Sequence, residues 1–181
     1  MMNRYILTID CGTQSVRAIL FDEEGNLVAK EKQEFEPYFS HYPGWAEQDP
    51  ELLWKSACEV CKNLKTSFPE HWEKVIGVTV TTQRDTGVNL DIEGNVLRPA
   101  IIWLDQRMAK CEKPMSKRYN LMFSAVGMQK AVEVSRKKSK SNWIKENQPD
   151  IWKKTYKYLL LSGFLNYKLT GKYKEAEQLV V

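Results

Sequence analysis

YILTIDCGTQSVRAILFDEEGNLVAK, residues 5–30, contains two apolar runs rich in β-forming residues, 5–9 and 16–21. The polar turn DEEGN (22–26) follows the second run, and a third run occupies residues 27–35. Short apolar runs joined by tight polar turns predict an antiparallel meander of three strands.

The loop between the first two runs has the composition of a phosphate-binding site. Asp10 closes the first strand, and Gly12 lets the backbone approach a ligand closely. Thr13 and Ser15 offer hydroxyls, successive N–H groups can form an anion-binding concavity, and Arg17 adds positive charge. A carboxylate beside phosphates suits Mg²⁺. The alternative is an ordinary hairpin turn capped by an aspartate.

The rest of the chain alternates helical and strand patterns. Asp49 and Pro50 predict a helix start, followed by apolar residues at helical spacing. Residues 75–81 (VIGVTVT) predict a buried central strand, and 88–97 a hairpin. Further helices are predicted at 139–146 and at 156–169, the latter ended by Thr170-Gly171. This alternation predicts an α/β fold.

Two polar clusters follow apolar runs. Gln83, Arg84 and Asp85 supply donors, acceptors and both charges, which suits a ligand with many hydroxyls. The alternative is a solvated turn with a local ion pair. Trp103 could form an apolar wall for the C–H face of a sugar, and Asp105 could contact the ligand or cap a helix.

Composition and charge exclude several classes of protein. The 181 residues are 43% hydrophobic and 28% charged, which fits one globular domain of ordinary size. The net charge is +4, with a basic run at 136–140 but no nucleic-acid-binding motif, so no nucleic acid partner is expected. No apolar run is long enough to cross a membrane and no signal peptide is present, so a cytoplasmic protein is expected.

The cysteines suggest no metal site. Cys58 and Cys61 have CxxC spacing, but a zinc site needs a second ligand pair and neither His41 nor His71 has a histidine nearby. A packing role on a helix is the better interpretation.

Five segments, in this order and spacing, resemble the FGGY family of carbohydrate kinases over residues 5 to about 173. They are YILTIDCGTQSVRA (5–18), PGWAEQDPELLW (43–54), TTQRDT (81–86), RPAIIWLDQR (98–107), and KSNW (140–143) followed by YLLLSGFLNYKLTG (158–171).

The resemblance implies a ribonuclease-H-like, actin-like ATPase fold in which two domains close on ATP and a sugar or polyol. Residues 1–181 would form the N-terminal domain only, incomplete and with additional helices in its C-terminal half. The second, adenosine-binding domain would be absent. The family's catalytic aspartate lies beyond residue 181, so no catalytic residue is predicted within this chain.

The resemblance also assigns roles to residues. It implies that Asp10 assists Mg²⁺, and that the ATP phosphates contact Gly12, Thr13, Gln14, Ser15 and Arg17. It implies that the substrate contacts Gln83, Arg84, Asp85, Trp103 and Asp105. Arg84-Asp85 is more similar to the Gln-Arg-Glu of glycerol kinases than to the Gln-Met-His of xylulokinases, but Ser135 stands near the position of a glycerol kinase tyrosine. Glycerol, a pentulose and longer polyols all remain open.

The predicted function is the N-terminal part of an ATP-dependent kinase that phosphorylates a sugar or polyol hydroxyl, with no phosphoryl transfer by the isolated chain. The alternative is a non-catalytic ribonuclease-H-like module for binding or self-association. An incomplete sheet would leave an uncovered apolar surface through which a homodimer could form.

Overall fold

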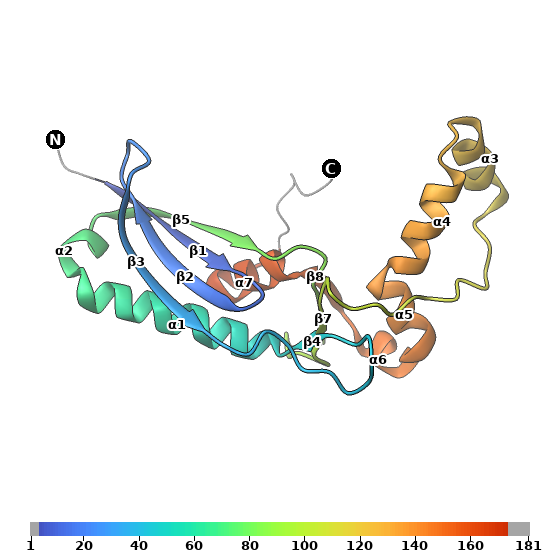
Figure 1. Cartoon of the computed structure of the whole chain (residues 1–181), viewed down its shortest axis with the longest axis horizontal. Helices are drawn as coiled ribbons and strands as arrows, with labels where there is room; N and C mark the ends of the chain where they lie inside the picture. Colours follow the sequence, from blue (N-terminus) through green and yellow to red (C-terminus); the bar gives the residue numbers. More distant parts are fainter. Residues whose placement is uncertain (1–3, 174–181) are drawn as a thin grey trace.

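The computed structural model describes residues 4–173, which form two small sheets and seven helices (Figure 1). The larger sheet has the strand order β3-β2-β1-β5. Its strands are β1 (Tyr5–Cys11), β2 (Ser15–Phe21), β3 (Leu27–Glu34) and β5 (Val75–Thr82). The first three form the predicted antiparallel meander, and β5 runs parallel to β1. The α/β prediction is therefore confirmed.

The smaller sheet joins segments that are far apart in the sequence. Its order is β4-β7-β6-β8, and all its pairings are antiparallel. The strands are β4 (Glu47–Gln48), β7 (Ala100–Ile101), β6 (Gly87–Leu90) and β8 (Lys157–Leu160).

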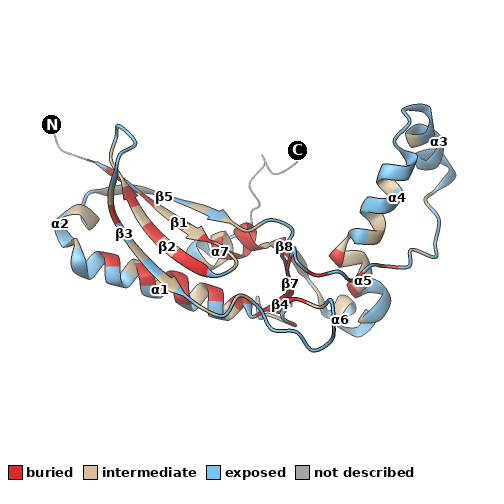
Figure 2. Ribbon diagram, in the orientation of Figure 1, coloured by how far each residue is buried: buried red, intermediate tan, exposed pale blue. Residues whose placement is uncertain are grey.

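Helix α1 (Pro50–Ser67) begins as the sequence predicts. The Asp49 carboxylate accepts a hydrogen bond from the Glu51 N–H at 2.9 Å, and Pro50 occupies the first turn. Its buried side chains pack on the alternate residues of β1 and β2 that point to the same face (Figure 2). They include Leu53, Ala57, Val60 and Leu64. This layer is the main hydrophobic core.

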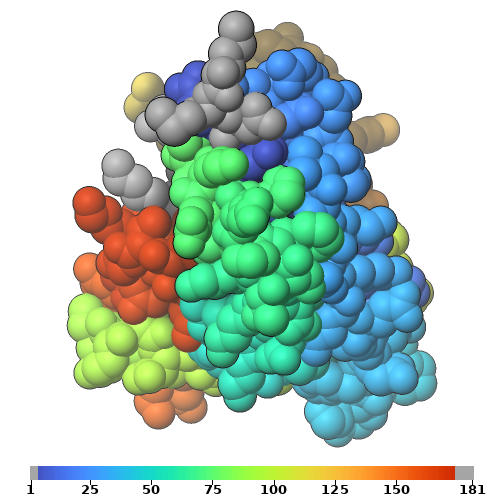
Figure 3. Space-filling model, turned by 90° about the vertical axis from the view of Figure 1, so that its left-hand side faces the viewer, coloured from blue at the N-terminus to red at the C-terminus, as the bar shows by residue number. Residues whose placement is uncertain are grey.

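The prediction of one helix over 156–169 is wrong in its first part. Residues Lys157–Leu160 form β8 along the edge of β6, and helix α7 (Leu161–Thr170) starts only afterwards. The segment is apolar almost throughout, so its periodicity could not separate strand from helix. Gly171 ends α7 in the left-handed conformation, as predicted. Helix α7 lies beside α1 (Figure 3).

The prediction that 75–81 is a buried central strand is also wrong. Among the described residues, β5 pairs only with β1 and forms an edge of the sheet. Ile76 and Val78 are 61% and 54% exposed. The β-branched composition indicates a strand, but it does not fix how many neighbours that strand has.

The remaining helices are α2 (Pro69–Trp72), α3 (Lys117–Ala125), α4 (Gln129–Lys138), α5 (Lys140–Asn147) and α6 (Pro149–Lys154). The predicted helix at 139–146 corresponds to α5. Helices α3 and α4 project from the body as an arm and contain no buried residue (Figures 1 and 2). None of the described helices is long and apolar enough to span a bilayer.

Candidate functional site

The loop between β1 and β2 lines an open cavity of about 630 Å³, named here the loop cavity. The loop is closed by a hydrogen bond from the Gly12 N–H to the Ser15 carbonyl, at 3.0 Å. Side chains of both charges, from Arg17 and Lys32 and from Glu34 and Glu36, complete the wall with the ring of Trp103. Its lining residues include Gly12, Thr13, Gln14, Ser15, Arg17, Lys32 and Trp103. The structure therefore brings all five predicted phosphate-binding residues together.

Asp10 and Arg17 form an ion pair beside this cavity. They lie directly opposite each other on β1 and β2, and Arg17 Nη1 is 2.6 Å from Asp10 Oδ2. Both side chains are about one-third exposed. Arg17 lines the loop cavity, whereas Asp10 is not among its lining residues. The predicted metal ligand is thus held by the guanidinium at the cavity's edge.

Gln83 positions the loop through a closed ring of hydrogen bonds. Thr13 Oγ1 donates to Gln83 Oε1 at 2.9 Å, and Gln83 Nε2 donates to Gln48 Oε1 at 2.6 Å. Gln48 Nε2 donates to the Thr13 carbonyl at 2.8 Å, which closes the ring. Gln83 was predicted to contact substrate, but both ends of its amide are used in this ring. Gln48 was missed, because no local pattern pairs it with Thr13, 35 residues away.

Trp103 joins the same arrangement. Its indole N–H donates to Thr13 Oγ1 at 3.0 Å, and its side chain lies against the loop cavity with 52% of the residue exposed. The Trp103 ring therefore borders the loop of residues 12–15.

A second cavity, of about 520 Å³, lies beside Asp85 and is named here the Asp85 cavity. Hydroxyl, ammonium and carboxylate groups line it, from residues that include Asp85, Ser135, Lys138, Ser139, Lys140, Ser141 and Tyr158. Asp85 has a φ of 49°, a left-handed conformation that non-glycine residues adopt rarely and mostly at special sites. Arg84 lines neither of these two cavities.

Burial raises the pKa of two groups that line the Asp85 cavity, Asp85 and Tyr158. Desolvation raises the pKa of Asp85, while the nearby Lys140 partly opposes that rise. Burial also raises the pKa of Tyr158 to about 12, helped by the negative charge of Asp85. The phenol therefore keeps its proton near neutral pH and can donate a hydrogen bond, while Asp85 can accept one.

Asp105 does not face either cavity, contrary to the prediction that it lines the substrate pocket. Its side chain is fully buried, and it accepts hydrogen bonds from the Ala46 N–H at 2.7 Å and from Arg107. No helix begins at this point, so it is not a helix cap either. Arg107 is stacked between Trp45 and Trp143, with its Cζ 4.0 and 4.5 Å from the ring centroids.

Two residues that the sequence did not single out, Glu47 and Arg98, complete this buried network. Glu47 Oε1 accepts hydrogen bonds from both Arg98 and Arg107, and all these side chains are at most 6% exposed. Lys140, which also lines the Asp85 cavity, donates to the Asp105 carbonyl at 2.7 Å. The network fixes the segment that carries Trp103 and is connected to the Asp85 cavity.

The cysteines lie apart from these cavities. Burial raises the pKa of Cys11 to about 12, with a smaller contribution from Asp10, and that of Cys61 to about 11. Within residues 4–173, no group of three potential metal-ligating side chains lies close enough together to hold an ion.

A sheet of order β3-β2-β1-β5, with a polar loop that joins β1 to β2, is typical of the actin-like ATPase fold of sugar kinases. Superposition on a xylulose kinase from Rhodospirillum rubrum covers 94% of this chain and 35% of that one, with a TM-score of 0.75 and 28% identity. A glycerol kinase from Plasmodium falciparum, solved with ADP, gives a TM-score of 0.64 at 25% identity over 93% of this chain and 35% of that one. The predicted fold is therefore confirmed.

The chain belongs to the FGGY family of carbohydrate kinases, because the model of that family's N-terminal domain matches residues 5–177. A glycerol kinase from Thermococcus gammatolerans is 32% identical over 177 residues, which is 95% of this chain and 35% of that protein. One from Ectopseudomonas mendocina is 34% identical over 94% of this chain and 35% of its own length. The chain thus spans about a third of the length of these relatives.

Proposed function

We propose that this chain is the N-terminal part of an ATP-dependent kinase that phosphorylates a hydroxyl of a sugar or polyol, acting in the cytoplasm. The observation that supports this most is the ring of hydrogen bonds through Gln83. Residue 83 follows β5 and bonds to Thr13 in the loop cavity, while Asp85, two residues later, lines the second cavity. Phosphoryl transfer needs the phosphate and the accepting hydroxyl to be held side by side.

In this proposal the loop cavity holds the ATP phosphates. Loop N–H groups and the hydroxyls of Thr13 and Ser15 can donate to phosphate oxygens, and Arg17 supplies a guanidinium that suits them. Gln48 and Gln83 hold the loop's shape.

The residues fit Mg²⁺ in its usual mode of binding to nucleotide enzymes. Asp10 offers one partly exposed carboxylate, and Mg²⁺ is commonly held by one or two carboxylates together with phosphate oxygens and water. When bound, the ion would neutralise phosphate charge. Arg17, which is ion-paired with Asp10 and lines the loop cavity, is proposed to contact the phosphate. No group in residues 4–173 is assigned as the base that accepts the substrate proton.

The Asp85 cavity is proposed to bind the sugar or polyol. Asp85 can accept hydrogen bonds from substrate hydroxyls, while Tyr158 and the serine hydroxyls can donate or accept. Ser135, on the arm side of the cavity, leaves room that an aromatic ring would fill. This favours substrates larger than glycerol, such as a pentulose.

Calorimetric titration of the 181-residue chain with Mg-ADP, and separately with glycerol and a set of pentuloses, tests both assignments. Arg17→Gln should weaken nucleotide binding about tenfold, the value of one charge-assisted contact, without changing polyol binding. Asp85→Asn should do the reverse. Arg4→Gln, which removes an exposed ion pair with Glu23, is the matched control. The proposal fails if neither ligand class binds, or if both variants affect the two classes alike.

We also propose that the isolated chain self-associates through β5, whose apolar residues Ile76 and Val78 are exposed at an edge of the sheet. Light scattering after size exclusion should give a mass above that of the 21.1 kDa monomer. Val78→Lys should restore the monomer, because a charge at an edge strand opposes pairing. Thr66→Lys, on the exposed side of α1, is the control substitution. A monomeric unmodified chain at high concentration would contradict the proposal.

A further inference from the structure

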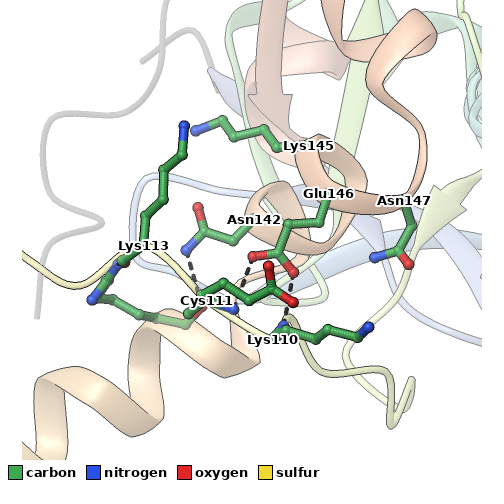
Figure 4. Close-up of a pocket in the computed structure, with 9 residues that line it drawn as sticks. Lys110, Cys111, Lys113, Asn142, Lys145, Glu146 and Asn147 are labelled. Carbon is green, nitrogen blue, oxygen red and sulfur yellow. Dashed lines mark hydrogen bonds between the residues drawn. The ribbon is translucent and has the colours of Figure 1, made fainter.

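A third cavity, of about 560 Å³, lies between the segment 110–113 and helix α5 and is named here the lysine cavity (Figure 4). Its walls carry four cationic side chains, from Lys110, Lys113, Arg136 and Lys145. Its lining includes none of the residues of the loop cavity or of the Asp85 cavity.

The acidic residues of the lysine cavity do not balance these cations. There are two, Glu112 and Glu146. Both oxygens of Glu146 are already used, because they accept hydrogen bonds from the backbone N–H groups of Lys110 and Cys111 at 2.7 and 2.9 Å. The cavity therefore carries an excess of positive charge.

Two of the ammonium groups, those of Lys113 and Lys145, face each other across the cavity with no carboxylate drawn between them, whereas Lys110 points away from them (Figure 4). Within residues 4–173, the Lys110 and Lys113 side chains form no ion pair, and Lys145 has only its contact with the Trp152 ring, 4.5 Å from Nζ to the centroid. Like charges facing each other are unfavourable unless an anion lies between them.

The backbone of the cavity is held at both ends. Glu146 fixes residues 110 and 111, and Arg136 Nη2 donates to the Lys113 carbonyl at 2.7 Å. Asn142 in turn donates to the Arg136 carbonyl at 2.9 Å. Cys111 adopts a left-handed φ of 54°. Because these contacts define the segment's shape, the lysines start from a backbone that does not need to be ordered by a ligand.

We propose that the lysine cavity is a binding site for a phosphorylated small molecule, separate from the proposed nucleotide site. Lys113 and Lys145 hold the phosphate between their ammonium groups. A phosphate carries up to two negative charges and three acceptor oxygens, so it can satisfy several ammonium donors at once. This inference does not depend on the proposed kinase function.

Inorganic pyrophosphate is the probe, and the 181-residue chain is titrated with it by NMR and by calorimetry. All measurements use the Arg17→Gln background, in which binding at the loop cavity is expected to be about tenfold weaker, and the NMR shifts separate the two cavities by residue. Saturable shifts are expected at the amides of Cys111, Asn142 and Lys145. The double substitution Lys113→Gln and Lys145→Gln should weaken binding at least tenfold, because each lysine provides a charge-assisted contact.

The control is Lys153→Gln, a lysine on α6 that is 78% exposed and lies outside the cavity. It removes one positive charge, against two in the double variant, and should leave binding unchanged. The proposal is overturned if pyrophosphate does not saturate, or if the double variant binds as tightly as the Lys153 control. It is also overturned if the shifts fall on residues outside the lysine cavity. Unchanged NMR spectra of the free double variant will show that it remains folded.

Discussion

Asp105→Ala is expected to lower the free energy of unfolding by about 3–5 kcal/mol, because it removes one partner from a buried network of charges. In the native protein, Asp105 and Glu47 balance Arg98 and Arg107, and all four side chains are almost completely buried. Without Asp105, two guanidinium groups would share one carboxylate, and the Ala46 N–H would lose its acceptor. For a chain of this size, the melting temperature should fall by roughly 10 °C.

Urea unfolding followed by circular dichroism measures this effect. The matched control is Asp150→Ala, which removes an exposed ion pair with Lys153. The Asp150 side chain is 89% exposed, so this substitution should leave the unfolding midpoint unchanged. Asp105→Asn keeps the shape of the side chain but not its charge, so its loss in free energy of unfolding should lie between those of Asp105→Ala and Asp150→Ala. A loss below about 1 kcal/mol for Asp105→Ala would contradict the view that this network holds the site together.

The loss should depend on pH in a defined direction. Burial alone would raise the pKa of Asp105, but hydrogen bonds from Arg107 and the Ala46 N–H, with the attraction of Arg107, lower it overall. Because the folded pKa lies below the unfolded one, the contribution of this carboxylate to stability is complete above about pH 4. It is lost as the pH falls through the folded value. The difference in stability between wild type and Asp105→Asn should therefore shrink as the pH falls from about 4 toward 2.

The second large effect is expected for Gly87→Val, which should cost about 1–3 kcal/mol or more through overpacking. Gly87 lies in β6, and a Cβ at this position would be 2.1 Å from the Tyr158 hydroxyl oxygen and 2.2 Å from its Cζ. No atom can occupy that space, so the tyrosine ring must move. Tyr158 also lines the Asp85 cavity, so the polyol binding proposed for that cavity should be lost along with stability.

A double-mutant cycle identifies the cause. In the Tyr158→Ala background, Gly87→Ala should cost much less than in the wild-type chain, because the atoms it would clash with are gone. Gly77→Ala is the matched control, since a Cβ there meets only the flexible Ile6 side chain at 3.2 Å. Equal costs of Gly87→Ala in both backgrounds would show that the glycine is needed for another reason.

The N-terminal half of the fold could be predicted from the sequence because its signals are local. The turn at Asp22 shows this, since its side chain accepts hydrogen bonds from the Glu24 and Asn26 N–H groups within the same turn. The cap of α1 is equally local. By contrast, β8 was predicted as helix, because the partner that makes it a strand is β6, about 70 residues earlier.

The candidate site also divides into features set by local sequence and features set by contacts between distant segments. The sequence by itself determined the meander, the start of α1 and the polar loop 12–15, because each depends on residues within a few positions of one another. Only the tertiary structure decided which side chains face a cavity and which hold it in place. Asp105 and Gln83 are the two examples, since their partners Ala46 and Gln48 lie 59 and 35 residues away. A carboxylate or amide carries the same donors and acceptors in either role, and its role is set by whichever partners the fold brings within hydrogen-bond distance.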